Sequence, residues 1–123
     1  MYPTGLHFLN SGICIALLFL LSDFGSKRGW YQKKGNWFSR VMHFSGGFLV
    51  AMFWSGLTGY ISLILALTIL VGVLWEFWEY FCRVCKHKKT VLPKGVTLIR
   101  DTAEDLILDT AGAVVFTLLW AYL

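Results

Sequence analysis

Residues 60–82 read YISLILALTILVGVLWEFWEYFC, and the first charged side chain in this stretch is Glu76. A helix that crosses the hydrocarbon core of a bilayer needs about 20 predominantly apolar residues. The stretch has that length, and the Gly-Leu-Thr-Gly sequence at 56–59 that precedes it is typical of a tight turn. Residues 60–82 therefore predict a transmembrane helix.

Three other segments have a similar apolar character, so we expect four transmembrane helices. The expected spans are residues 5–21, 41–57, 60–82 and 100–123. Composition supports a membrane protein, because 57% of the residues are hydrophobic and only 15% are charged, against about 25% charged in an average soluble domain. A chain of 123 residues has room for one domain and buries too little of its surface to hide this excess. The predicted fold is an all-α, polytopic four-helix bundle that forms a single membrane domain.

The basic residues predict how the chain crosses the membrane. All 11 Lys and Arg residues lie within or directly beside the two longer segments that connect the expected spans, residues 22–40 and 83–99. Loops rich in Lys and Arg stay on the cytoplasmic side. Both connecting segments are therefore expected in the cytoplasm, and both termini on the non-cytoplasmic side of a bacterial cytoplasmic membrane.

The formal net charge of +4 does not indicate a nucleic-acid partner. The basic residues lie beside apolar spans, where they meet anionic lipid headgroups, and the chain contains no motif of a nucleic-acid-binding fold. Membrane lipids are the expected partners.

Acidic residues gather at the cytoplasmic ends of the third and fourth expected spans, and one histidine lies at the same end of the second. In chain order these residues are His43, Glu76, Glu79, Asp101, Glu104, Asp105 and Asp109. On a helix, Asp101, Asp105 and Asp109 fall on one narrow stripe. We therefore expect these groups to face protein or water at membrane depth, and not lipid.

An ionisable side chain at that depth costs at least ~2.5 kcal/mol to insert, which makes it a candidate for a functional site. The carboxylates can be compensated by arginines at the rim, by protons or by bound cations. Carboxylates with an imidazole suit Mg²⁺, Mn²⁺ or Zn²⁺ better than soft metals. The candidate metal ligands are His43, Glu76, Glu79, Asp101, Asp105 and Asp109. The candidate catalytic residues are Asp105, Asp109 and His43, and the candidate phosphate-binding residues are Arg40, Arg83 and Arg100.

Each of these residues also has a purely structural interpretation. Asp101 and Glu104 fall in the first turn of a helix, where acidic side chains favour the macrodipole and cap the helix. Glu79 can extend to the interface beside Arg83, and His43 can form a hydrogen bond that only holds two helices together. The sequence leaves these alternatives open.

Small residues lie about one turn from the polar ones and predict close helix packing. They are Gly46, Gly47, Gly72 and Gly112. Helices in lipid associate through close backbone contact at such residues.

Three motifs occur in order at the same ends of successive spans: HFSGG at 43–47, WEFWE at 75–79 and DTAEDLILDTAG at 101–112. In this order and spacing the chain resembles the VanZ-like and YjdF-like group of small bacterial membrane proteins, over about residues 40–115. The residues that this resemblance implies as shared are His43, Glu76, Glu79, Asp105, Asp109 and Gly112.

Three functions follow from these features. The first is a divalent-metal site that acts on a phospholipid or lipid-linked headgroup, with an acid or His43 as general base. The second is transport of a cation or proton, for which four helices would assemble as a homo-oligomer. The third is a structural or accessory protein whose polar cluster fixes helix packing. The sequence assigns no enzyme class.

Overall fold

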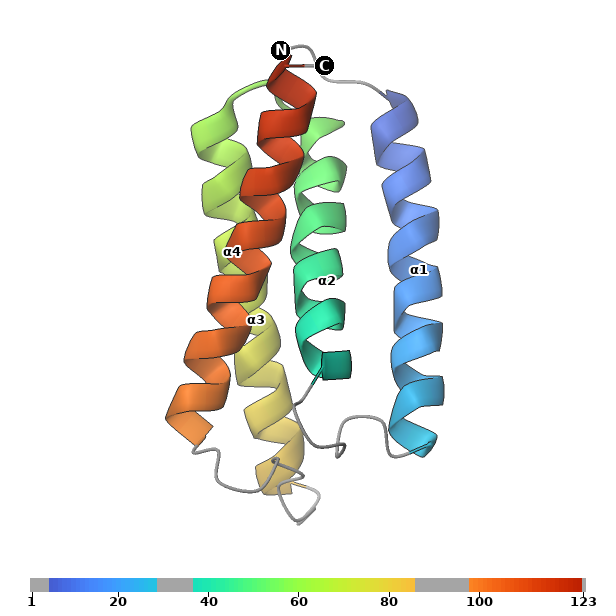
Figure 1. Ribbon diagram of the computed structural model, residues 1–123, viewed down its shortest axis with the longest axis vertical. Coiled ribbons are helices and arrows are strands. Elements are labelled where there is room, and N and C mark those ends of the chain that lie inside the picture. Colours follow the sequence, from blue (N-terminus) through green and yellow to red (C-terminus); the bar gives the residue numbers. More distant parts are fainter. Residues whose placement is uncertain (1–4, 29–36, 86–97, 123) are drawn as a thin grey trace.

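The computed structural model describes residues 5–28, 37–85 and 98–122, with their side chains except at 26, 79, 82–85 and 98–101. Within these ranges the chain forms four helices: α1 (Gly5–Lys27), α2 (Trp37–Ser55), α3 (Ile61–Cys85) and α4 (Leu98–Tyr122). They stand side by side and alternate in direction (Figure 1). The first turn of α1, the turn between α2 and α3 and the last turn of α4 therefore share one end of the bundle. We call the opposite end, where α1 and α3 finish and α2 and α4 begin, the His43 end.

Three of these helices are long and apolar enough to cross a bilayer, over Gly5–Gly25 in α1, Ile61–Trp78 in α3 and Thr102–Tyr122 in α4. Large apolar side chains on these helices point outward; Leu17, for example, is 59% exposed. An exposed apolar surface of this kind is typical of contact with lipid or with another protein. The predicted all-α class is thereby confirmed, with three apolar spans among the described residues.

Helix α2 is not one of the three, and its position explains why. The other three helices all pack against it, so its side chains meet protein more often than the outside of the bundle. A helix enclosed by neighbours does not need an apolar residue on every face. Accordingly, α2 accommodates Arg40, His43 and two adjacent glycines within 19 residues.

The helix ends differ from the predicted span ends, most of all in the segment predicted as the loop 22–40. Helix α1 continues six residues beyond residue 21, and α2 begins four residues before residue 41. In the added turns of α1, Lys27 Nζ lies 3.0 Å from Asp23 Oδ2. Apolar composition predicts how much of a helix lies in lipid, whereas the backbone hydrogen bonds continue into polar turns that water can reach.

The closest helix crossing joins α2 and α4. A Cβ on Gly47 would overlap the carbonyl oxygen of Asp109, and a Cβ on Gly112 would overlap the carbonyl oxygen of Phe44. Only glycine fits at either position, because the two backbones are in direct contact. This crossing fixes how α4 faces α2 one turn away, where the polar residues lie.

Beyond this crossing the interior is mainly apolar, and the buried hydroxyls of Thr68 and Thr117 donate to carbonyls of their own helices. Ala51, Ile64, Ala113 and Phe116 are all at most 4% exposed and form the hydrophobic core of the described bundle. We call these four residues the apolar layer. Ala51 lies four residues after Gly47 on α2, so the layer sits beyond the glycine crossing, on the side away from His43.

Candidate functional site

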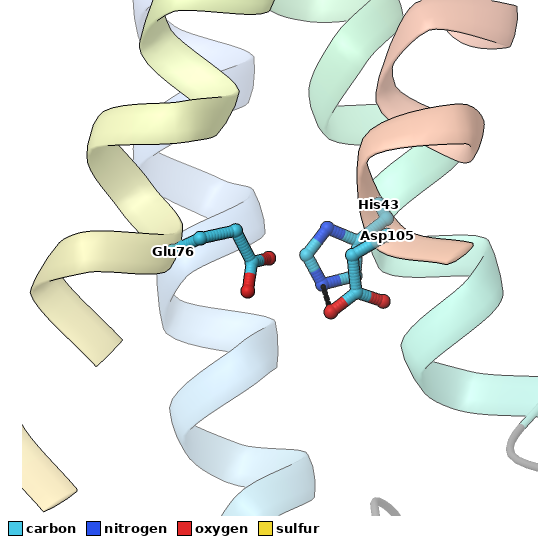
Figure 2. A group of neighbouring side chains, drawn as sticks. All are labelled: His43, Glu76 and Asp105. Atoms are coloured by element: carbon cyan, nitrogen blue, oxygen red, sulfur yellow. Dashed lines mark ion pairs between the residues drawn. The ribbon is translucent and has the colours of Figure 1, made fainter. Parts of the chain in front are cut away.

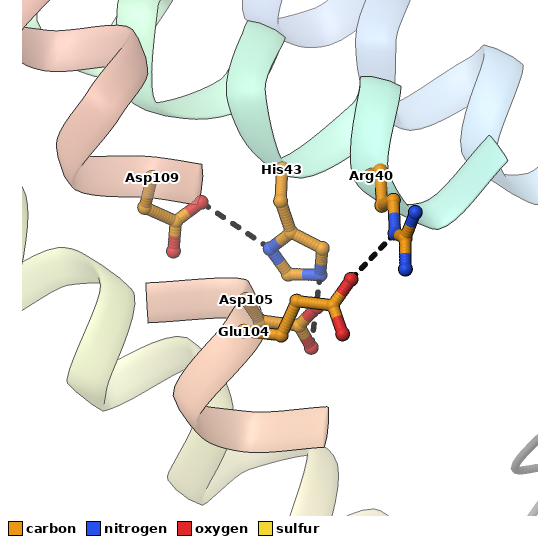
Figure 3. A network of polar contacts seen from close by, with 5 residues as sticks. All are labelled: Arg40, His43, Glu104, Asp105 and Asp109. Atoms are coloured by element: carbon orange, nitrogen blue, oxygen red, sulfur yellow. Dashed lines mark hydrogen bonds and ion pairs between the residues drawn. The ribbon is translucent and has the colours of Figure 1, made fainter. Parts of the chain in front are cut away.

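A histidine on α2 lies between two acids of α4. Nε2 of His43 is 3.2 Å from Oδ2 of Asp105, and Nδ1 is 3.2 Å from Oδ1 of Asp109. The two aspartates are four residues apart, so α4 presents them on one face, one turn above the other. Both are buried, at 3% and 9% exposed. Figure 3 shows the imidazole between the two carboxylates.

The tautomer of His43 decides which ring nitrogen donates to a carboxylate. A neutral imidazole donates through one ring nitrogen only, and an ionised carboxylate only accepts. A neutral His43 can therefore donate to only one of the two aspartates at a time, through Nδ1 to Asp109 or through Nε2 to Asp105.

A third acid reaches the same place from α3. His43, Glu76 and Asp105 each offer one ligand atom, and these atoms lie within 4.8 Å of one another. In Figure 2 the carboxylate of Glu76 points from α3 towards the imidazole. Ligand atoms about 2.1 Å from a tetrahedral metal ion are roughly 3.4 Å apart. A side-chain adjustment of about 1 Å would therefore bring the three atoms to coordination distance.

Asp109 is held by α3 and α2 together. A Cβ on Gly72 would lie 2.9 Å from Oδ2 of Asp109, so α3 has no side chain where this carboxylate reaches. Oδ1 of Asp109 contacts His43, and the main-chain carbonyl oxygen of Asp109 lies against Gly47. The carboxylate of Asp109 is thus confined on both sides.

A partly exposed ion pair lies at the edge of the site. Nε of Arg40 lies 2.5 Å from Oε1 of Glu104, with the side chains 55% and 27% exposed. Arg40 precedes His43 by one turn and Glu104 precedes Asp105 by one residue, so the pair lies beside the cluster (Figure 3). One of the predicted rim arginines therefore neutralises an acid at the start of α4.

The structure describes no side chain for several of the predicted site residues. The side chains of Glu79, Arg83, Arg100 and Asp101 lie outside the described residues. A Cβ on Gly46 would meet only Leu18 Cδ2, at an ordinary 3.8 Å. Of the predicted packing glycines, the structure thus brings Gly47, Gly72 and Gly112 against neighbouring helices.

A second polar contact lies at the other end of the bundle, and the sequence did not predict it. Nδ1 of His7 is 3.1 Å from Oγ of Ser55, which itself donates to the carbonyl oxygen of Met52. The Ser55 oxygen therefore accepts a hydrogen bond from Nδ1–H of His7. The only sequence signal was a histidine in the first turn of an apolar span, with Ser11 one turn further on. The apolar layer lies between this contact and His43.

Comparison with known proteins places the chain in a family. A family model described as "Predicted membrane protein (DUF2238)" matches residues 9–123. No curated protein and no solved structure matches the chain. The matched range contains α2, α3, α4 and nearly all of α1. It therefore includes the His43 cluster, by which we mean His43, Glu76, Asp105 and Asp109. The chain therefore belongs to the DUF2238 family of predicted membrane proteins.

Proposed function

We propose that this is a four-span membrane protein whose His43, Glu76 and Asp105 bind a divalent metal ion at the cytoplasmic end of the bundle. The observation that carries the proposal is the convergence of one imidazole and two carboxylates from three different helices within 4.8 Å. These three residues are far apart in the sequence, so only the tertiary structure brings them together.

The bundle architecture supports four spans with this orientation. Helix α2 has 19 residues and is about 28 Å long, close to the thickness of the hydrocarbon core. Helices α1, α3 and α4 enclose it, so it can cross with fewer apolar residues. The described basic side chains, those of Lys27, Arg28 and Arg40, lie at the His43 end, and the other Lys and Arg residues fall within or beside residues 22–40 and 83–99 of the sequence. This distribution favours a cytoplasmic location for the His43 end and a non-cytoplasmic one for both termini.

The depth of the cluster suits an encounter with lipid headgroups. The apolar span of α4 begins at Thr102, so Asp105 lies about 4.5 Å and Asp109 about 10 Å inside it along the axis. A phosphate of a phospholipid or lipid-linked substrate would reach this depth with its headgroup. We propose such a headgroup as the substrate class.

A divalent metal ion bound there would stabilise negative charge on phosphate oxygens and on a bound water. The residues have separate tasks in this proposal. His43, Glu76 and Asp105 hold the ion, and Arg40 at the rim attracts the phosphate.

Metal content tests the proposal. Protein purified without chelator, in nanodiscs, would be analysed by inductively coupled plasma mass spectrometry. The wild type is expected to carry about one equivalent of Mn, Zn or Fe, which Asp105→Asn removes. The matched control is Asp23→Asn, the same change at an exposed acid of α1 that pairs with Lys27. Weakly held Mg²⁺ would show as a thermal shift on its addition. A wild type without metal and without any shift would overturn the proposal.

A structural role is the second candidate, because His43 already contacts a carboxylate with each ring nitrogen. In this role, the contacts of His43 with Asp105 and Asp109 would only fix the register of α2 against α4. Substitution of His43 would then lower thermal stability in a protein that binds no metal.

The structure offers less support for transport of protons or cations. The apolar layer separates the residues around His43 from the His7–Ser55 contact. The buried hydroxyls of Thr68 and Thr117, which lie beside this layer, each donate to a main-chain carbonyl of their own helix. A hydrated path would therefore have to form between copies in a homo-oligomer. Ion flux in liposomes containing the purified protein would establish this alternative.

A further inference from the structure

We propose that the ion is a transition-metal dication bound through Nε2 of His43, and that Asp109 is a positioning residue and not a ligand. This inference rests on the metal site proposed above and specifies it further. It divides the two buried aspartates of α4 between different tasks: Asp105 coordinates, and Asp109 orients the ring.

The contacts assign the two ring nitrogens. Asp105 contacts Nε2, and Asp105 is the aspartate that shares the group of three ligand atoms with His43 and Glu76. Asp109 contacts Nδ1. The lone pairs of the two ring nitrogens point away from each other, so the imidazole itself separates Asp109 from an ion at Nε2.

The surroundings of Asp109 favour the same assignment. One carboxylate oxygen lies 3.2 Å from Nδ1 of His43, and the other lies against Gly72 on α3. Histidines that bind metals usually donate their second ring N–H to a carboxylate or carbonyl, which fixes the tautomer and the ring orientation. Asp109 has the position of that acceptor.

The ligand set indicates the class of cation. One imidazole nitrogen and two carboxylates suit Zn²⁺, Mn²⁺ or Fe²⁺. Calcium takes six to eight oxygen ligands, and magnesium prefers carboxylates and retained waters. Three protein ligands also leave at least one coordination position open, as in catalytic sites, and a water or a phosphate oxygen fits there.

The test combines affinity with a direct observation of the ring. Zn²⁺ binding to the full chain in nanodiscs would be measured by competition with a chromophoric chelator, for the wild type, Asp109→Asn and Asp105→Asn. Asp109→Asn is expected to keep one equivalent of Zn²⁺ with roughly 10–100-fold weaker affinity. Asp105→Asn is expected to lose stoichiometric binding. Gly72→Ala, which removes no polar group, should reproduce the Asp109→Asn effect by displacing the carboxylate of Asp109.

The tautomer would be read on the wild type, so the test does not depend on a variant that folds. With ¹⁵N-labelled histidine and bound Zn²⁺, long-range ¹H–¹⁵N spectra should show His43 protonated at Nδ1 and metal-bound at Nε2. His43→Asn would identify its signals among those of the three histidines.

The outcomes separate this inference from the proposed function. Zn²⁺ bound through Nδ1, loss of stoichiometric binding in Asp109→Asn, or equal competition by Mg²⁺ would overturn the inference and leave a metal site. A wild type that binds none of these cations would overturn both.

Discussion

His43 and Asp109 are 66 positions apart in the chain, yet Nδ1 of the histidine lies 3.2 Å from Oδ1 of the aspartate. The glycine crossing of α2 and α4 places them together: Gly47 follows His43 by one turn and lies against the main chain of Asp109 itself. Packing and site geometry therefore depend on the same few residues. Substitutions at the crossing are expected to disturb both.

Gly47→Ala is expected to destabilise the protein strongly. Its Cβ would overlap the carbonyl oxygen of Asp109, and overpacking of this kind costs about 1–3 kcal/mol or more. Unfolding in mixed micelles with increasing SDS would measure the loss. Gly46→Ala is the matched control, since its Cβ meets only Leu18 at 3.8 Å, and it should be neutral or slightly stabilising. Equal destabilisation by Gly47→Ala and Gly46→Ala would contradict the close backbone contact between α2 and α4.

The His43–Asp109 contact is expected to show energetic coupling in a double-mutant cycle. His43→Leu and Asp109→Leu should each destabilise, because each leaves a partner buried without its bond, and the double variant should lose less than the sum. Coupling between residues in direct contact is typically about 0.5–3 kcal/mol. The comparison pair is Asp23 and Lys27, whose ion pair is exposed and should show little coupling. Additive effects at the buried pair would argue against the observed contact.

Metal binding is expected to compete with protons. An ion at Nε2 of His43 requires that nitrogen to be unprotonated, and carboxylate ligands must be ionised. Affinity for Zn²⁺ should therefore rise with pH. Titration calorimetry in buffers of different ionisation enthalpy would count the protons. An affinity for Zn²⁺ that does not change with pH would contradict coordination by His43 and the carboxylates.

Gly56→Ala is expected to separate α1 from the turn between α2 and α3. Its Cβ would lie 2.7 Å from Cβ of Phe8, closer than such atoms approach in proteins. The change should lower stability and disturb the His7–Ser55 contact next to it, visible in the NMR signals of His7. Gly12→Ala, where nothing lies within 4 Å of the added Cβ, should leave both unchanged.

Cysteine accessibility is expected to show opposite sides for the two ends of the bundle. In a variant with the three native cysteines replaced by serine, Leu57→Cys in the exposed turn should react with an impermeant maleimide added outside intact cells. Lys27→Cys, exposed at the His43 end, should react only after the membrane is permeabilised. The reverse pattern would invert the proposed topology.

Much of the architecture follows from local composition. Three of the four expected spans correspond to helices that are apolar enough to cross a bilayer, because about 20 apolar residues determine such a helix without reference to its neighbours. The spacing of Asp105 and Asp109 likewise placed them on one face, and both are buried there. The clustering of the acids at one end of the bundle was also predictable, because these residues stand at the ends of expected spans in the sequence.

The pairings were decided by the tertiary structure. Helical periodicity shows which residues share a face, but the rotation and crossing of helices decide which faces meet. For this reason the sequence grouped Glu104 with the other acids, whereas the fold pairs it with Arg40, and His7 gave no sign that it would meet Ser55. Composition alone determined that the chain forms apolar helices with acids at one end. Only the steric fit of backbones at Gly47 and Gly112, a contact between distant parts of the chain, placed His43 between Asp105 and Asp109.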